Sequence, residues 1–203
     1  HLTSNSEGLP LYMVVFPVDN LYVPVGENVE IPVTAYLVTG DGSEWDSPDV
    51  TASVAWSPLS LSSHPVPGGI PSETPVTKNG YSEILFPVVN NFATGNPTYQ
   101  VNAEVANYTV SGKPIDIGTV SASSGAIQFI PGEPAKVEFN NTNIYLRADG
   151  NHTATVSVTV YDQFNNPVFL PAKTTFQIDG DADIISADEQ TTNGVASVTI
   201  QGG

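Results

Sequence analysis

The chain has no cysteine and very few cations. Five Lys and Arg residues stand against 21 Asp and Glu residues, which gives 203 residues a net charge of −16. Without cysteine there are no disulfides and no thiolate metal sites. Nucleic acid and anionic lipid both require clustered Lys and Arg, so the composition excludes them as partners.

Charge is scarce overall, because only 13% of the residues are charged. No apolar run approaches the ~20 residues that span a bilayer, so we expect no membrane insertion. The chain begins with His1 rather than Met, which is typical of a terminus left after a signal peptide has been removed. Sequons at Asn107, Asn140 and Asn151 favour export and N-linked glycans. We therefore expect an extracellular glycoprotein.

Alternation of apolar and polar residues is the strongest pattern present. Residues 154–161 alternate strictly, and turn residues flank them at Gly150 and at Asn165-Asn166-Pro167. The stretch 20–36 repeats the arrangement of 143–161, so the chain contains two copies of one β module. No segment has helical periodicity, which predicts an all-β protein with two β-sandwich modules in tandem.

The repeat sets the expected boundaries of the modules. Residues 1–18 form a tail, 19–125 the first module and 126–203 the second, with a hinge at 121–125. In our alignment Val14 and Phe16 of the tail match Val137 and Phe139 of the second copy. The first copy is thus apolar on a face where the second copy is polar. Residues 50–56 alternate and predict a strand, which 173–178 resembles in the second copy.

Several turn motifs resemble the bacterial immunoglobulin-like domains of the invasin and intimin type. These motifs are Arg147-Ala-Asp-Gly150, Asn165-Asn-Pro-Val168 and Thr192-Asn-Gly-Val-Ala-Ser-Val-Thr199. The resemblance covers the second copy well and the first copy loosely, where Val25-Gly26 and Asn79-Gly80 remain. It implies immunoglobulin-like β-sandwiches that serve as stalk and adhesion modules on cell surfaces.

The second copy is shorter than the first. After Asn79-Gly80 the first copy continues through expected strands at 98–110 and 115–123, whereas Asn193-Gly194 is followed only by 195–203. We therefore expect the second sandwich to lack one or two C-terminal strands. Such a gap leaves an apolar groove and unpaired backbone groups, which another strand would have to cover.

The expected donor strand is the apolar segment from Leu9 to Val18, inserted into the next subunit. Head-to-tail donation does not close on itself and so produces a fibre. This arrangement resembles donor-strand-complemented pili, among them the glycosylated thread subunits of archaea. The donor residues are Leu9, Leu11, Met13, Val15, Phe16 and Val18.

The resulting prediction is a structural subunit of an extracellular cell-surface filament that serves adhesion or biofilm formation. Its partners would be copies of itself, N-linked glycans, and host or neighbouring cell surfaces. The alternative is a fragment of an invasin-like adhesin, in which the second module is completed by its own downstream chain.

Enzymatic chemistry is the remaining alternative. Lytic polysaccharide monooxygenases bind copper through an N-terminal His and a second His, here His1 with His64 or His152, but a two-module repeat differs from that fold. Asp179, Asp181 and Asp183 offer oxygen ligands for Ca²⁺, although such a run is more typical of a solvated turn.

No nucleophile triad or phosphate loop is present. We predict no catalytic residues, no metal site, no cofactor and no enzyme activity. Trp56 ends an alternating strand and should belong to the core. Trp45, in an acidic turn, is a candidate contact for a sugar or a neighbouring molecule.

Overall fold

The structure is a computed structural model that describes residues 10–26, 30–39, 50–77, 79–92, 95–110, 112–115 and 118–203. Every regular element in these ranges is a β-strand, which confirms the all-β prediction. The same ranges contain no helix that is long and apolar enough to cross a membrane. The strands are β1 (Pro10–Phe16), β2 (Leu21–Pro24), β3 (Ile31–Thr39), β4 (Val50–Ser60), β5 (Glu73–Pro75), β6 (Tyr81–Phe86), β7 (Thr98–Val105), β8 (Tyr108–Val110), β9 (Lys113–Ile115), β10 (Val120–Ser123), β11 (Ile127–Ile130), β12 (Lys136–Phe139), β13 (Thr153–Tyr161), β14 (Ala182–Ala187) and β15 (Val195–Gly202).

The chain divides into two compact units. The first contains residues 1–89 and 96–130, and the second contains 90–95 and 131–203. The expected boundary at residue 125 thus differs from the observed one, which lies after Ile130. Residues 90–95 lie between β6 and β7 in the sequence and yet belong to the second unit.

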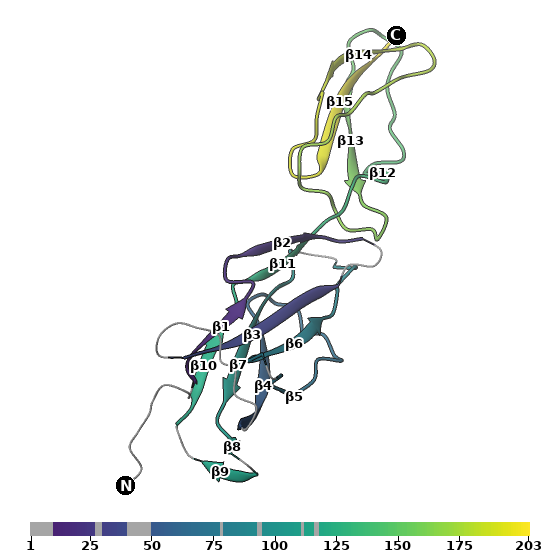
Figure 1. Ribbon diagram of the computed structural model, residues 1–203. Helices are drawn as coiled ribbons and strands as arrows, with labels where there is room; N and C mark the ends of the chain where they lie inside the picture. The colour runs from purple at the N-terminus through teal and green to yellow at the C-terminus, as the bar shows by residue number, and fades with distance from the viewer. Residues whose placement is uncertain are drawn as a thin grey trace. The chain divides into compact units, whose positions relative to one another are not determined.

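The first unit is a sandwich of two sheets. One sheet has the order β1-β3-β6, and the other follows β2-β11-β7-β4-β8-β9, with β10 on β7 and β5 on β4 (Figure 1). β2 runs parallel to β11, and the other pairs in both sheets are antiparallel. Two largely antiparallel sheets packed face to face are the arrangement of an immunoglobulin-like sandwich.

Alternate side chains along the strands point inward and fill the space between the two sheets. Val33 and Leu37 of β3 are fully buried, and the ring of Phe86 on β6 lies 5.3 Å from Tyr99 and 6.4 Å from Phe129 across the sandwich. Trp56 is buried and its Nε1–H donates to Thr74 Oγ1 at 2.6 Å, which confirms its predicted place in the core.

The stretch expected to be a hinge, residues 121–125, belongs to the first unit and includes most of β10. β10 and β11 both pair with β7, and residues 124–126 form a short break between them. At this break the Gly125 N–H donates to Pro17 O at 2.7 Å, and the Ser124 hydroxyl accepts from Val101 N at 3.0 Å. Both bonds join residues of the first unit, so the segment closes that sandwich.

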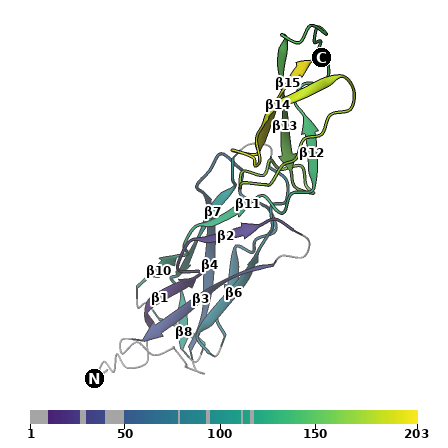
Figure 2. The same ribbon diagram turned by 90° about the horizontal axis from the view of Figure 1, so that it is seen from above.

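The second unit contains a single sheet with the order β12-β13-β15-β14 (Figure 2). The two residues Asn193 and Gly194 have φ values of 51° and 80°, and Thr192 and Val195 exchange both backbone hydrogen bonds around them. This geometry is a type I′ turn, for which Asn-Gly is the preferred sequence. The predicted turn at this position is confirmed.

The registers of β12-β13-β15 reproduce those of β1-β3-β6. Leu37 N donates to Gly80 O just as Val160 N donates to Gly194 O, so Leu37 corresponds to Val160. Leu37 pairs with Met13, and Val160 pairs with Val137. Met13 and Val15 therefore correspond to Val137 and Phe139, and our alignment of Val14 and Phe16 with these residues was wrong by one position.

Candidate functional site

In the described residues of the second unit, no second sheet forms opposite β12, β13, β15 and β14. Residues 173–178 correspond to β4 but form no strand, and only an isolated bridge joins Lys173 to Gln190. The predicted strand there is wrong for a physical reason. In the first unit β4 pairs with β7, and residues 131–203 contain no counterpart of β7. Residues 143–146, which correspond to β2, likewise lack a counterpart of its partner β11.

The exposed fractions of equivalent side chains show which part of the second unit is left uncovered. In the first unit Met13 is 7% exposed and Val15 is 2% exposed. Their counterparts Val137 and Phe139 are 59% and 62% exposed. Two equivalent positions of the equivalent sheets are therefore buried in the first unit and open to solvent in the second. Burying a side chain of this kind contributes about 1.5–3 kcal/mol.

These side chains line an open cleft of about 420 Å³. Its walls come from β12, β13, β14, β15 and the extended stretch 172–178, and most of its lining is aliphatic or aromatic. Lys173 is the one charged side chain among the lining residues. The apolar lining residues are Pro134, Val137, Phe139, Val156, Val158, Val160, Ala172, Phe176, Ile178, Ile184, Val198 and Ile200. A surface of this kind accepts alternate apolar side chains of an added β-strand.

A buried carboxylate organises the turn that follows β13. Asp162 is 1% exposed, and its oxygens accept from the backbone N–H groups of Gly132, Phe164 and Asn166 at 2.8–2.9 Å. The Asn166 side-chain amide donates to the same carboxylate at 2.9 Å. Burial by itself would raise the pKa of Asp162, but the hydrogen bonds together outweigh it and the pKa lies below its usual value.

Asn166 extends this network within the second unit. Its Nδ2 donates to Asn90 O and its Oδ1 accepts from Phe92 N, both at 2.7 Å. The sequence indicated a turn at Asn165-Asn166-Pro167, and Asn165 indeed has a φ of 63°. The contact with residues 90–92 was missed, because nothing in the sequence signals that a loop between two strands of the first module belongs to the second.

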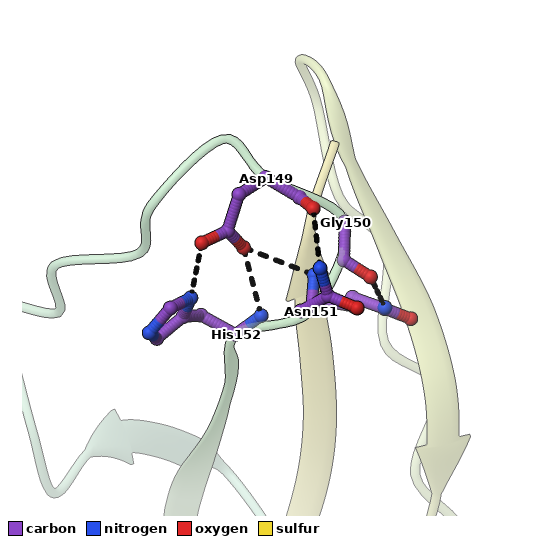
Figure 3. Close-up of polar contacts among 5 residues, drawn as sticks. Asp149, Gly150, Asn151 and His152 are labelled. Carbon is purple, nitrogen blue, oxygen red and sulfur yellow. Dashed lines mark hydrogen bonds and ion pairs between the residues drawn. The ribbon is translucent and has the colours of Figure 1, made fainter.

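A second carboxylate holds the turn before β13 (Figure 3). Asp149 Oδ1 accepts from the backbone N–H groups of Asn151 and His152 at 3.0 and 3.1 Å, and Oδ2 lies 2.5 Å from His152 Nδ1. The His152 side chain, followed by the backbone bonds, lowers the pKa of Asp149. His152, one of the candidate copper ligands, is thus engaged within its own turn.

The predicted donor residues have several different environments. Leu9 and the side chain of Leu11 lie outside the described residues. Met13 and Val15 face the core of their own module, because β1 pairs with β3 along residues 10–16. Phe16 and Val18 are exposed. β1 therefore has a place in its own module, and donation of this segment to another subunit stays a prediction.

The three sequon asparagines are all exposed. Asn107 lies between β7 and β8, and Asn151 lies in the turn of Figure 3. Asn140 follows β12, and its Nδ2 donates to Ser157 Oγ at 3.1 Å. Exposure satisfies the first requirement for glycosylation, which stays a prediction.

The structure brings no metal-binding group together at the other candidate residues that it describes. His1 and Trp45 lie outside the described residues. His64 lies near Ser62 in the first unit, with 3.3 Å between its Nδ1 and the hydroxyl. Asp179, Asp181 and Asp183 are exposed, and the described part of the chain contains no group of three or more His, Asp or Glu side chains positioned to hold a metal ion.

No protein-family profile and no curated protein sequence matches the chain. Among solved structures, it is similar to the FdeC adhesin of Escherichia coli, with 18% identity, a TM-score of 0.38, and coverage of 94% of this chain and 55% of FdeC. InvD of Yersinia pseudotuberculosis gives 15% identity, a TM-score of 0.45, and coverage of 94% and 48%. A β-glycosidase from Bacteroides vulgatus gives 13% identity, a TM-score of 0.35, and coverage of 94% and 21%.

The chain therefore spans about half the length of FdeC and InvD. TM-scores below 0.5 do not assign a function, and the function proposed below rests on the geometry of the chain itself.

Proposed function

We propose that this chain is a non-enzymatic structural part of an extracellular surface protein, and that its second module is completed by β-strand addition. The open inner face of β12, beside the apolar cleft, is the observation that carries the proposal. Two sheet positions that are buried in the first unit, at Met13 and Val15, are more than half exposed in the second, at Val137 and Phe139. The sequons and the scarcity of Lys support an extracellular location.

The first source of the missing strands is a second copy of the chain. Strand donation requires a strand near one end of the chain with few partners of its own. Among the described residues, β1 is an edge strand of a three-stranded sheet and pairs there with β3 alone. A copy that released β1 could present Met13 and Val15 to the cleft of its neighbour. Because donor and acceptor lie in different units, repeated donation builds a filament, which would serve adhesion or biofilm formation.

The second source is the same polypeptide, in an adhesin that carries more immunoglobulin-like repeats than these 203 residues. The pairing of β1 with β3 favours this source, because β1 is then not needed elsewhere. The role would be a stalk or adhesion module on a cell surface.

Cysteine trapping separates the two sources, and the absence of native cysteine makes it clean. Chains with Val15→Cys and chains with Phe139→Cys are mixed under oxidising conditions. Strand donation predicts a disulfide-linked dimer and, in the double variant, a ladder of polymers. A matched control replaces Val195, an exposed residue on the opposite face of β15, with Cys in place of Phe139→Cys.

Deleting residues 1–18 provides the second measurement. If electron microscopy showed filaments from the deleted chain, donation by this segment would be wrong. Absence of cross-links together with a cooperative, monomeric melt of residues 1–203 would sink strand addition from either source, because the second unit would then be stable as it stands.

A further inference from the structure

The outer face of the three-stranded sheet in the first unit carries a cluster of aromatic and apolar side chains. The registers place them in two adjacent rows across β1, β3 and β6. One row contains Phe16, Thr34 and Glu83, and the other contains Val14, Tyr36 and Tyr81. The aromatic face comprises Tyr12, Val14, Phe16, Tyr36, Val38 and Tyr81.

The rings on this face contact one another and remain accessible. Phe16 and Tyr36 meet edge to face with centroids 5.6 Å apart, and Tyr36 and Tyr81 lie 5.7 Å apart. Tyr12 is 58% exposed and Phe16 is 48% exposed. Val14, Phe16, Tyr36 and Val38 line a shallow hollow of about 390 Å³. Contiguous exposed apolar surface of this kind marks an interaction site more often than scattered exposed residues do.

The fold does not require these residues, as the second unit shows. Glu138, Thr159 and Val195 occupy the positions that correspond to Val14, Tyr36 and Tyr81. Asn140, Ser157 and Ser197 occupy those of Phe16, Thr34 and Glu83. Lys136 and Tyr161 occupy those of Tyr12 and Val38. The equivalent sheet thus forms with a mainly polar face that carries one valine and a single aromatic ring. The aromatic rings of the first unit are therefore dispensable for the sheet and available for binding.

Charge narrows the class of ligand. The aromatic face carries no cation, and Glu83 beside it is exposed, with Oε2 accepting from the Thr34 hydroxyl at 3.0 Å. Anionic ligands are repelled by this carboxylate and by the net charge of −16, and a second copy carries the same net charge. A neutral ligand that has apolar C–H faces for the rings and hydroxyl donors for Glu83 fits both features.

We propose that this aromatic face binds uncharged carbohydrate. The rings of Phe16, Tyr36 and Tyr81 contact the C–H faces of the sugar, and the Glu83 carboxylate accepts hydrogen bonds from its hydroxyls. Pockets for small molecules combine aromatic walls with a few placed polar groups in the same way. The site lies wholly in the first unit and requires β1 to stay paired with β3. It is therefore compatible with strand addition to the second unit from the same polypeptide, whereas a copy that released β1 would lose the site.

The test is affinity electrophoresis of the full chain through gels that contain a neutral polysaccharide. Mannan, dextran and mixed-linkage β-glucan are the neutral probes, and alginate is the anionic comparison. At least one neutral polysaccharide should retard the chain, and alginate should not. Titration calorimetry with the corresponding hexasaccharide then gives the affinity. Tyr36→Thr and Tyr81→Val, which introduce the residues of the second unit, should each weaken binding about tenfold.

Tyr145→Thr is the matched control, because Tyr145 is a tyrosine that is 95% exposed and belongs to the second unit rather than to the sheet of β1, β3 and β6. It should leave binding unchanged. Trp56 fluorescence and a thermal melt report whether each variant is folded. If Tyr36→Thr does not fold, Tyr12→Lys and Glu83→Ser decide the matter, since both alter exposed side chains.

Three results would overturn the proposal. The first is free migration in all three neutral gels. The second is equal loss of binding in Tyr145→Thr and Tyr36→Thr. The third is concentration-dependent self-association, seen by sedimentation, that Tyr36→Thr abolishes while no neutral sugar competes with it. In that case the face is an interface between copies.

Discussion

Truncating equivalent residues in the two units should have very different effects. Met13 and Val137 occupy the same position of the same sheet, yet Met13 is 7% exposed and Val137 is 59% exposed. Replacing a buried Met with Ala costs about 2–5 kcal/mol, because the lost side chain leaves a cavity. A Val that is more than half exposed loses only part of the ~1.5–3 kcal/mol of full burial, so Val137→Ala should cost below about 1 kcal/mol.

Urea unfolding tests this contrast. Both tryptophans precede residue 60, so their fluorescence reports on the first unit, and pulse proteolysis reports on the second. Met13→Ala should lower the fluorescence midpoint clearly, and Val137→Ala should leave the proteolysis midpoint nearly unchanged. A cost for Val137→Ala equal to that of Met13→Ala would refute the reasoning, because the inner face of the second unit would then be covered. Addition of the strand partner should increase the cost of Val137→Ala.

Three further outcomes are expected. Asp162→Ala should lower the free energy of unfolding of the second unit by about 2–3 kcal/mol, because buried N–H groups lose a charged acceptor. The pKa of Asp162 in the folded chain lies below the usual 3.8, so the stabilisation by its carboxylate is complete above pH 3.8 and is lost as the pH falls through the folded pKa. The urea midpoints of the variant and the wild type should therefore converge in strong acid. Gly125→Ala should cost at least about 2 kcal/mol, because its Cβ would lie 2.3 Å from Asp19 O, whereas Gly68→Ala, whose Cβ meets nothing within 4 Å, should be tolerated in thermal melts. Asn107→Gln in the chain exported by its native host should lower the intact mass by one glycan, and an unchanged mass would show that the sequon is empty.

The local features of the fold could be predicted from the sequence, because they depend on short patterns. Strict alternation predicted β13, and Asn193-Gly194 predicted the turn before β15. The relation between the copies was predicted less well. Met13 and Val14 are both apolar, as are Val15 and Phe16, so alternation could not decide which pair faces the core. Only the hydrogen-bond register settles that choice.

The candidate site was predicted in outline, because residues 126–203 show fewer strand patterns than the first copy does. The sequence could not show that residues 173–178 would lose their strand as well. A β-strand forms only beside a partner strand, and the alternating pattern of residues 173–178 does not reveal whether a partner is present. The pairing of β1 with β3 could not be predicted either, because the partner residues lie 18 to 29 positions away in the sequence.

If strand addition completes the second unit, as proposed above, the folding of this unit depends on the supply of strands. A partner that binds only the folded state adds RT ln(1 + [L]/Kd) to the free energy of unfolding, or about 2.7 kcal/mol at a hundredfold excess over Kd. The second unit would then have no fixed stability of its own, and its resistance to proteases would rise with the local concentration of its partner. Chains that fail to find a strand would be degraded selectively, so unassembled material would not accumulate.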